Sequence, residues 1–269
     1  MLERFFKLKE NGTDVKTEVL AGITTFMTMA YILAVNPSIL AAAGMDQGAV
    51  FTATALAAVI GTLLMALLAN YPFSLAPGMG LNAYFAYTIV LGMGYSWQYA
   101  LTAVFAEGII FILLSATNIR EAIFNAIPTN LKSAVSVGIG LFIAFIGLQN
   151  AKIVIGGSTL LQLFSVDAYN EVNGVNATFN DVGITVLLAI IGVLVTGIMV
   201  IKNVKGNILL GILATWILGV ICQFTGLYVP NPELGFYNLL PDFSSGLSIP
   251  SLAPVFCKLD FSGIFSLNF

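Results

Sequence analysis

The clearest chemical signal is "FSLAPGMGLNAYFAY", residues 73–87, within an uncharged stretch that covers residues 71–94. Pro77, Gly78 and Gly80 fall within four positions, and these residue types are the least suited to an unbroken helix. A helix that starts after such a break leaves unpaired, partly positive N–H groups in its first turn. The pattern therefore predicts a polar ligand site at a helix break.

Side chains suited to ligand binding follow the break directly. Asn82 offers both a hydrogen-bond donor and an acceptor, and it could instead cap the half-helix. The rings of Tyr84 and Phe85 could stack on a planar aromatic ligand. For Phe85, ordinary helix packing is the favoured interpretation, so the prediction depends mainly on Asn82 and Tyr84.

An acidic residue, Glu107 in "FAEGIIF", lies eleven residues into an apolar run that covers residues 97–117. An ionised carboxylate at the centre of a bilayer costs about 2.5–3.5 kcal/mol on insertion scales, so such residues tend to be functional. Glu107 is thus a candidate for proton coupling. The other interpretation is a neutral carboxyl that bonds a neighbouring helix or the broken backbone.

The first apolar run, "GITTFMTMAYILAVNP", also carries polar side chains at helical spacing. Thr and Ser in a membrane span often bond a carbonyl of their own helix. This interpretation is favoured for Thr24, whereas Thr28 and Tyr31 are candidates to line a cavity. Small residues in "SVGIGLFIAFIG", residues 136–147, predict a close contact between helices.

Composition identifies the solvent in which these groups act. Of the 269 residues, 58% are hydrophobic and 9% are charged, against about 25% charged in a soluble domain. No histidine is present, and the two cysteines, Cys222 and Cys257, match no metal or redox spacing. The sequence therefore predicts an all-α polytopic membrane protein in contact with the lipid bilayer, and not an enzyme. It predicts no metal, no cofactor and no nucleic-acid partner.

The apolar runs predict seven membrane spans, because a helix needs about 20 apolar residues to cross the bilayer. The third would combine roughly five extended residues, about 15 Å at 3.3 Å per residue, with a half-helix of about 18 Å from Leu81 to Gly92. The spans are predicted at residues 19–43, 49–69, 73–93, 97–117, 133–150, 182–201 and 206–225.

The basic residues predict the orientation of the chain. With the N-terminus in the cytoplasm and all seven segments crossing, only Lys152 and Lys258 fall outside, which is a strong positive-inside bias. The bias disappears if the broken third segment does not cross. The basic residues on the cytoplasmic side would be Arg4, Lys7, Lys9, Lys16, Arg120, Lys132, Lys202 and Lys205.

Four regions follow from this layout. Residues 1–18 form a polar cytoplasmic segment, and residues 19–117 hold the first four spans. Residues 118–225 begin with a segment typical of an amphipathic surface helix, broken at Pro128, and continue with spans five to seven. Residues 226–269 form an outer tail that turns apolar at "SGIFSLNF", as if another span were beginning, and the chain is therefore expected to be truncated.

Three stretches, "GITTFMTMAYILAVNPSIL", "PFSLAPGMGLNAYFAY" and "AVFAEG", together resemble the azaguanine-resistance (AzgA-like) purine permeases. These belong to the wider nucleobase–cation symporter family, which includes xanthine and uracil permeases. The resemblance implies a fold of two inverted seven-helix halves, of which this chain would be the first. It assigns spans one to four to a core domain and spans five to seven to a gate domain, and it makes the third span a short strand plus a half-helix.

The resemblance also implies the function: uptake of a purine base (hypoxanthine, guanine or adenine) by proton symport across the plasma membrane. It carries over to Gly80, Asn82, Ala83 and Tyr84 as substrate-binding residues, which make only half a site. The chain alone is therefore expected to be inactive, and a homodimer is one assembly it allows. The alternatives are a sulfate- or bicarbonate-type anion transporter of the same architecture and a non-transporting membrane subunit.

Overall fold

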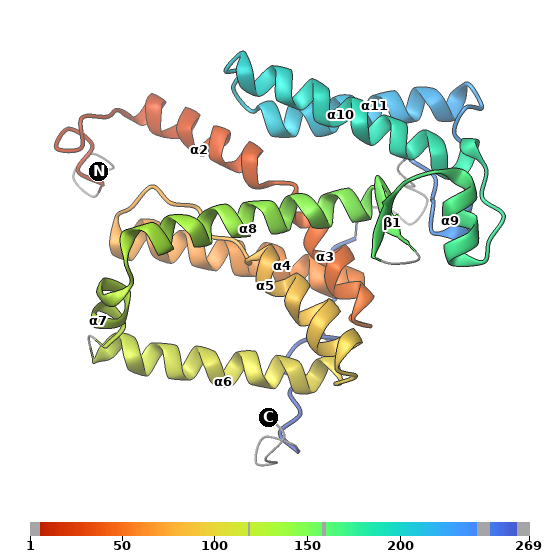
Figure 1. Cartoon of the computed structure of the whole chain (residues 1–269). Helices are drawn as coiled ribbons and strands as arrows, with labels where there is room; N and C mark the ends of the chain where they lie inside the picture. The colour runs from red at the N-terminus through yellow and green to blue at the C-terminus, as the bar shows by residue number, and fades with distance from the viewer. Residues whose placement is uncertain (1–5, 118, 158–159, 241–247, 263–269) are drawn as a thin grey trace. The chain divides into compact units, whose positions relative to one another are not determined.

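The computed structural model describes the chain except residues 1–5, 118, 158–159, 241–247 and 263–269 (Figure 1). Arg4 and the last residues of the apolar tail, which were predicted to begin a further span, lie outside the described residues, as does the side chain of Arg120. The elements are α2 (Val15–Met29), α3 (Ile32–Ala42), α4 (Gln47–Leu64), η1 (Met65–Ala69), α5 (Met79–Ala83), η2 (Tyr84–Gly92), α6 (Trp97–Ala116), α7 (Ile119–Ala126), α8 (Thr129–Asn150), β1 (Val154–Gly156), β2 (Leu161–Leu163), α9 (Val166–Asn173), η3 (Phe179–Gly183), α10 (Ile184–Ile201), α11 (Asn207–Phe224) and η4 (Pro232–Leu234).

Within the described residues, six helices are long and apolar enough to cross a membrane. They correspond to six of the seven predicted spans, and the seventh is the shorter apolar helix Met79–Gly92. The chain is thus a mostly helical, multi-pass membrane protein. The predicted break at Pro128 is confirmed, because α7 ends at Ala126 and α8 begins at Thr129.

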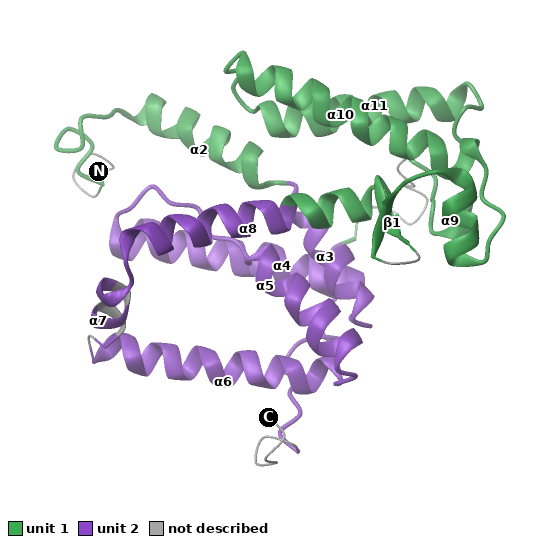
Figure 2. Cartoon of the chain, in the orientation of Figure 1, with its two compact units in different colours: residues 1–30, 144–248 green, residues 31–143, 249–269 purple. Residues whose placement is uncertain are grey.

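The chain divides into two compact units, drawn in different colours in Figure 2. Unit 1 comprises residues 1–30 and 144–248, and unit 2 comprises residues 31–143 and 249–269. The division passes through α8 and through the break between α2 and α3.

The predicted first span, residues 19–43, corresponds to the candidate membrane span Val15–Ala42, which this break interrupts once. The apolar run forms two helices, α2 and α3, which are separated at Ala30 and Tyr31. Pro37 lies inside α3, and it has no N–H to donate to the carbonyl of Leu33 in the preceding turn. The helix therefore lacks a backbone hydrogen bond close to the break, which weakens it locally.

In unit 2, α3 packs against α4, α5 and η2, and η2 packs against α6. Residues 249–262 of the C-terminal tail bond to the beginnings of two of these helices. Thr52 Oγ1, near the start of α4, donates to the carbonyl of Pro250 at 2.8 Å. Thr102 Oγ1, near the start of α6, accepts from the N–H of Asp260 at 2.8 Å. The tail therefore joins the beginnings of α4 and α6.

Residues 70–78 connect η1 to α5 without regular structure, where the family resemblance implied a short strand. Part of their backbone bonds to α4: the Thr62 hydroxyl donates to the Leu75 carbonyl at 3.3 Å and accepts from the Leu75 N–H at 3.0 Å. Leu75 lies so close to Gly61 that an added Cβ there would be 3.3 Å from it. Irregular backbone within a membrane requires such internal partners; here the Thr62 hydroxyl supplies them, and Gly61 leaves room for the close approach.

In unit 1, α10 and α11 form a tightly packed antiparallel pair (Figure 1). A small polar-loop subdomain precedes them along the chain: β1 and β2 pair antiparallel, and α9 packs on β1. Its core contains Ile155, Tyr169 and Val182. Asp181 caps the start of η3 by accepting from the N–H and hydroxyl of Thr178 at 2.5 and 3.0 Å.

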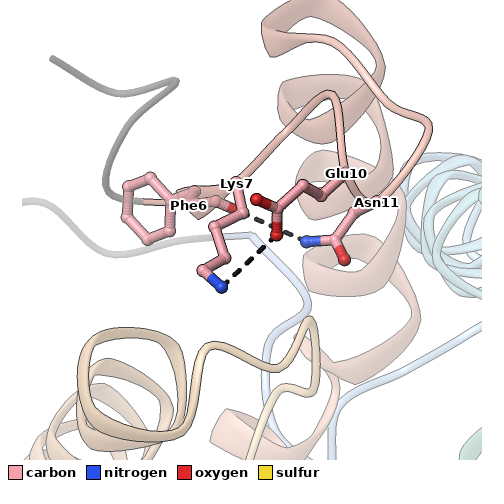
Figure 3. A network of polar contacts seen from close by, with 4 residues as sticks. All are labelled: Phe6, Lys7, Glu10 and Asn11. Carbon is pink, nitrogen blue, oxygen red and sulfur yellow. Dashed lines mark hydrogen bonds and ion pairs between the residues drawn. The ribbon is translucent and has the colours of Figure 1, made fainter.

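The polar N-terminal segment forms a turn ahead of α2, shown in Figure 3. Lys7 Nζ lies 3.3 Å from a carboxylate oxygen of Glu10, and Asn11 donates to the Phe6 carbonyl at 3.2 Å. Both charged side chains are exposed, so their ion pair contributes at most about 1 kcal/mol. Asp14 then caps α2 by accepting from the Thr17 N–H at 2.7 Å.

The predicted close helix contact along residues 136–147 is wrong for the chain as the structure describes it. A Cβ added at Gly138, Gly140 or Gly147 would meet nothing within 4 Å, and α8 has no buried residue. Small residues permit close approach, but they do not by themselves supply a partner helix.

Candidate substrate-binding site

The site is built on the half-helix formed by α5 and η2, residues 79–92. Gly78 precedes it in extended conformation and provides no side-chain cap. The first helical backbone bond runs from the Asn82 N–H to the Gly78 carbonyl at 3.1 Å. The N–H groups of Met79, Gly80 and Leu81 therefore have no partner within the helix, and they give its beginning a partial positive charge.

A chain of side-chain hydrogen bonds links this half-helix to α3 and α4. Asn82 Nδ2 donates to Asn36 Oδ1 at 2.6 Å, and Asn36 Nδ2 donates to Thr54 Oγ1 at 2.7 Å. Asn36 and Thr54 are each 2% exposed, whereas Asn82 is only partly buried. Asn82 thus joins buried polar groups to a more open position, and the interpretation of it as the helix cap is wrong.

The other predicted residues of this half-helix divide between packing and exposure. Ala83 and Phe85 are buried, and the packing interpretation of Phe85 is confirmed. Tyr84 is 49% exposed, so its ring is accessible in unit 2. A Cβ at Gly80 would be 3.7 Å from the ring of Phe142, which is ordinary contact and leaves room for a methyl group.

Glu107 lies in the middle of α6 with an exposed side chain. Within the described part of the chain, its carboxyl makes no hydrogen bond and no ion pair. The interpretation of it as a carboxyl bonded to a neighbouring helix is therefore not supported. The structure does not join Glu107 to the side chains of Asn82, Asn36 and Thr54.

The two candidates of the first apolar run fall in different units. Thr28 belongs to unit 1, and its hydroxyl donates to the Thr25 carbonyl at 2.8 Å within α2. Thr24 bonds the Leu20 carbonyl at 2.8 Å in the same way, as predicted. Tyr31 is half-buried at the start of α3 in unit 2.

An open groove of about 800 Å³ lies between α10 and α11 in unit 1. Its walls are mostly apolar, and its threonines Thr185, Thr196 and Thr215 donate their hydroxyl protons to carbonyls of their own turns. The groove therefore offers little to recognise a polar heterocycle. The half-helix of unit 2 is the better candidate site.

Asn36 and Thr54 are the residues that sequence reasoning missed as partners of Asn82. Asn36 was noticeable as an amide directly before Pro37 in an apolar run. Thr54, by contrast, is one of several hydroxyl residues in its helix, and no local pattern distinguishes it. Asn36 bonds to Thr54 across 18 residues and to Asn82 across 46 residues. Only the tertiary packing reveals such contacts.

Comparison with known proteins identifies the family. The sequence profile of the permease family matches residues 16–256. A protein of Methanocaldococcus jannaschii named only as a permease is 47% identical over 99% of this chain and 55% of that protein. The guanine/hypoxanthine permease PbuG of Bacillus subtilis is 45% identical over 95% of this chain and 54% of its own length. The adenine permease AdeP of Escherichia coli is 38% identical, with 92% and 54% covered.

The chain thus spans about half the length of the curated relatives it matches. The profile match covers most of the chain. These relatives are named as permeases and not as enzymes, which agrees with the prediction from the sequence. The resemblance noted for the three quoted stretches is confirmed at the level of the family. The chain therefore belongs to the permease family.

Proposed function

We propose that this chain forms part of a secondary transporter that takes up purine nucleobases across the plasma membrane by proton symport. The observation that carries the proposal is the uncapped half-helix whose Asn82 reaches out from a buried hydrogen-bond chain. Half-helix N-termini near the bilayer midplane are the usual construction for substrate sites in secondary transporters. Relatives named as guanine/hypoxanthine and adenine permeases favour a purine as the substrate.

The site would recognise a neutral, planar heterocycle. Gly80 would let the ligand approach the backbone, Asn82 would hydrogen-bond its edge, and Tyr84 would stack on its face, while the buried Ala83 would support the half-helix from behind. The site residues of this half-helix carry no positive side chain, which makes a sulfate- or bicarbonate-type substrate the less favoured alternative. Thr28 and Tyr31 remain proposed cavity residues.

Uptake in a strain that lacks its own purine permeases tests the function. Expression of the complete gene should give saturable uptake of labelled hypoxanthine that excess guanine or adenine reduces and excess sulfate does not. Uptake of sulfate without uptake of any purine would support the anion alternative. Uptake of neither substrate would support the non-transporting subunit.

We also propose seven spans with a cytoplasmic N-terminus, in which residues 19–117 belong to a core domain and residues 118–225 hold the gate domain. The chain would provide the first half of an inverted repeat and would be inactive without a second half, supplied in sequence or by a homodimer. The tail supports the crossing of the third segment, because it bonds the beginnings of both α4 and α6. If α4 and α6 begin on the same side of the membrane, α4 must cross the membrane and the third segment must cross it in the opposite direction.

Labelling of single cysteines by a membrane-impermeant reagent should separate the loops of this topology. We expect labelling from outside at residues 166–173 and no labelling at residues 202–205, in a background in which Cys222 and Cys257 are replaced by serine. Equal labelling of cysteines at residues 129–132 and 166–173 would mean that these loops share one side. The fifth predicted span, residues 133–150, would then not cross.

Replacement Glu107→Gln keeps the size of the side chain and removes its titration. If Glu107 couples protons, the variant should bind purine with nearly unchanged affinity and lose the pH dependence of accumulation. Ser115→Ala, also an exposed position of α6, is the matched control. Wild-type accumulation by Glu107→Gln from acidic to alkaline pH would remove the coupling role.

A further inference from the structure

The hydrogen-bond chain from Thr54 through Asn36 to Asn82 has a direction. The hydroxyl of Thr54 accepts from Asn36 Nδ2, and the oxygen of the same amide accepts from Asn82 Nδ2. An amide presents a donor group at one end and an acceptor at the other. The orientation of the Asn36 amide therefore determines which end of the Asn82 amide is used inside unit 2.

The end that remains is the oxygen of Asn82. Within the described part of the chain, its Oδ1 accepts no hydrogen bond, while its Nδ2 is held by Asn36 at 2.6 Å. Asn82 is partly exposed, so this oxygen is available to a ligand. The unpaired N–H groups of Met79, Gly80 and Leu81 lie one turn or less before it along the same helix.

Close packing restricts the orientation of the central amide. Asn36 and Thr54 are each 2% exposed, and the helices that carry them, α3 and α4, pack against each other. Water has little access to replace either hydrogen-bond partner of Asn36. If the Asn36 amide were reversed alone, its NH2 group would face the NH2 group of Asn82, so the amide of Asn82 would have to reverse as well. In the structure the hydroxyl of Thr54 accepts from Asn36 Nδ2 at 2.7 Å, and this contact holds the amide of Asn36 in the orientation described.

We propose that Asn36, held by Thr54, is a positioning residue that turns the oxygen of Asn82 towards the substrate. This proposal rests on the proposed function. The site then accepts a hydrogen bond from an N–H of the purine, while the N–H groups at the start of the half-helix serve the acceptor atoms of the same ring. The substrate class is a neutral base that carries a donor and an acceptor on neighbouring edges, and a base without that N–H is bound less tightly.

Two substitutions of Thr54, made in the complete gene product, test the direction of the hydrogen-bond chain. Thr54→Val preserves shape and removes the hydroxyl, and Thr54→Ser keeps the hydroxyl as the matched control. We expect Thr54→Val to raise the KM for hypoxanthine about tenfold, since a lost buried hydrogen-bond partner costs on the order of one decade in affinity. The maximal uptake rate per molecule in the membrane should stay within about twofold, and Thr54→Ser should behave like the wild type.

The decisive reading is selectivity, measured with hypoxanthine and its 1-methyl, 7-methyl and 9-methyl derivatives as competitors. Each derivative lacks one N–H. The 1-methyl derivative lacks N1–H, whereas the 7-methyl and 9-methyl derivatives both lack the imidazole N–H. In Thr54→Val, the preference for hypoxanthine over either the 1-methyl derivative or the 7- and 9-methyl pair should collapse, while the other preference persists. Equal losses for all four ligands, or an unchanged KM, would overturn the positioning role.

The outcomes separate this inference from the function on which it rests. A wild-type protein that takes up no purine contradicts the proposed function before any variant is made. A wild-type protein that transports purine, together with a Thr54→Val variant of unchanged selectivity, contradicts the positioning role alone. Surface levels of each variant, measured by immunoblot of isolated membranes, control for failure to fold.

Discussion

Replacement of Asn82 by alanine is expected to weaken purine binding roughly 5- to 150-fold, with insertion into the membrane preserved. The range corresponds to about 1–3 kcal/mol for a polar group of the ligand that loses its buried partner. In the structure the same substitution also removes the hydrogen bond that Asn36 Oδ1 accepts at 2.6 Å. The variant should therefore be less stable as well as weaker in binding.

The two effects can be measured separately. Purine affinity would be determined by competition on the purified protein, and stability by thermal unfolding without ligand. Thr88→Ala, an exposed position further along the same half-helix, is the control and should change neither. An Asn82→Ala variant that unfolds earlier but binds purine with wild-type affinity would leave Asn82 only a structural role between α3 and the half-helix.

Asn36→Ala offers a second comparison, because it breaks the same hydrogen bond from the other side. It should reduce stability by more than Asn82→Ala does, since both hydrogen bonds of the buried Asn36 amide are lost: Asn82 Nδ2 loses its partner and Thr54 loses its donor. The ligand-facing oxygen of Asn82 remains present but is no longer held. Affinity should thus fall less than in Asn82→Ala, which removes the oxygen entirely.

The sequence predicted the break at Pro77 and Gly78 because backbone chemistry is local. A proline lacks the N–H that a helix needs, and glycine makes a helix less stable. The structure begins the half-helix at Met79, two residues before the predicted Leu81, with Gly78 in the capping position. The same local logic correctly separated α7 from α8 at Pro128.

Contacts between distant segments could not be predicted in this way. In a chain whose spans are apolar on all sides, hydrophobic periodicity does not show which face of a helix meets a neighbour. The glycines of α8 were predicted to be packed and are open. No sequence pattern distinguished Gly192 and Gly211, which are in close contact with threonines of the facing helix. Asn36 and Thr54 became part of the candidate site only once α3 and α4 were seen side by side.

The close contacts of α10 and α11 give the second large expected effect, a loss of stability on substitution Gly211→Leu. A Cβ at Gly211 would collide with the side chain of Thr196, and a Cβ at Gly192 would collide with that of Thr215. The two contacts are reciprocal, since each helix offers one glycine and one threonine. Neither threonine can withdraw easily, because its hydroxyl donates to a carbonyl of its own helix at 2.7 or 2.8 Å.

Gly197 supplies the matched control on α10. A Cβ there would meet nothing within 4 Å, so Gly197→Leu adds the same side chain to open space and gains helix propensity of up to about 1 kcal/mol. Overpacking at a filled position typically costs about 1–3 kcal/mol. Thermal unfolding of the chain in detergent should therefore give Gly211→Leu and Gly192→Leu midpoints well below that of the wild type, and a Gly197→Leu midpoint equal to it or higher. Equal losses at all three positions would mean that the groove beside Gly197 is filled and that the helix pair is not held by its reciprocal glycine–threonine contacts.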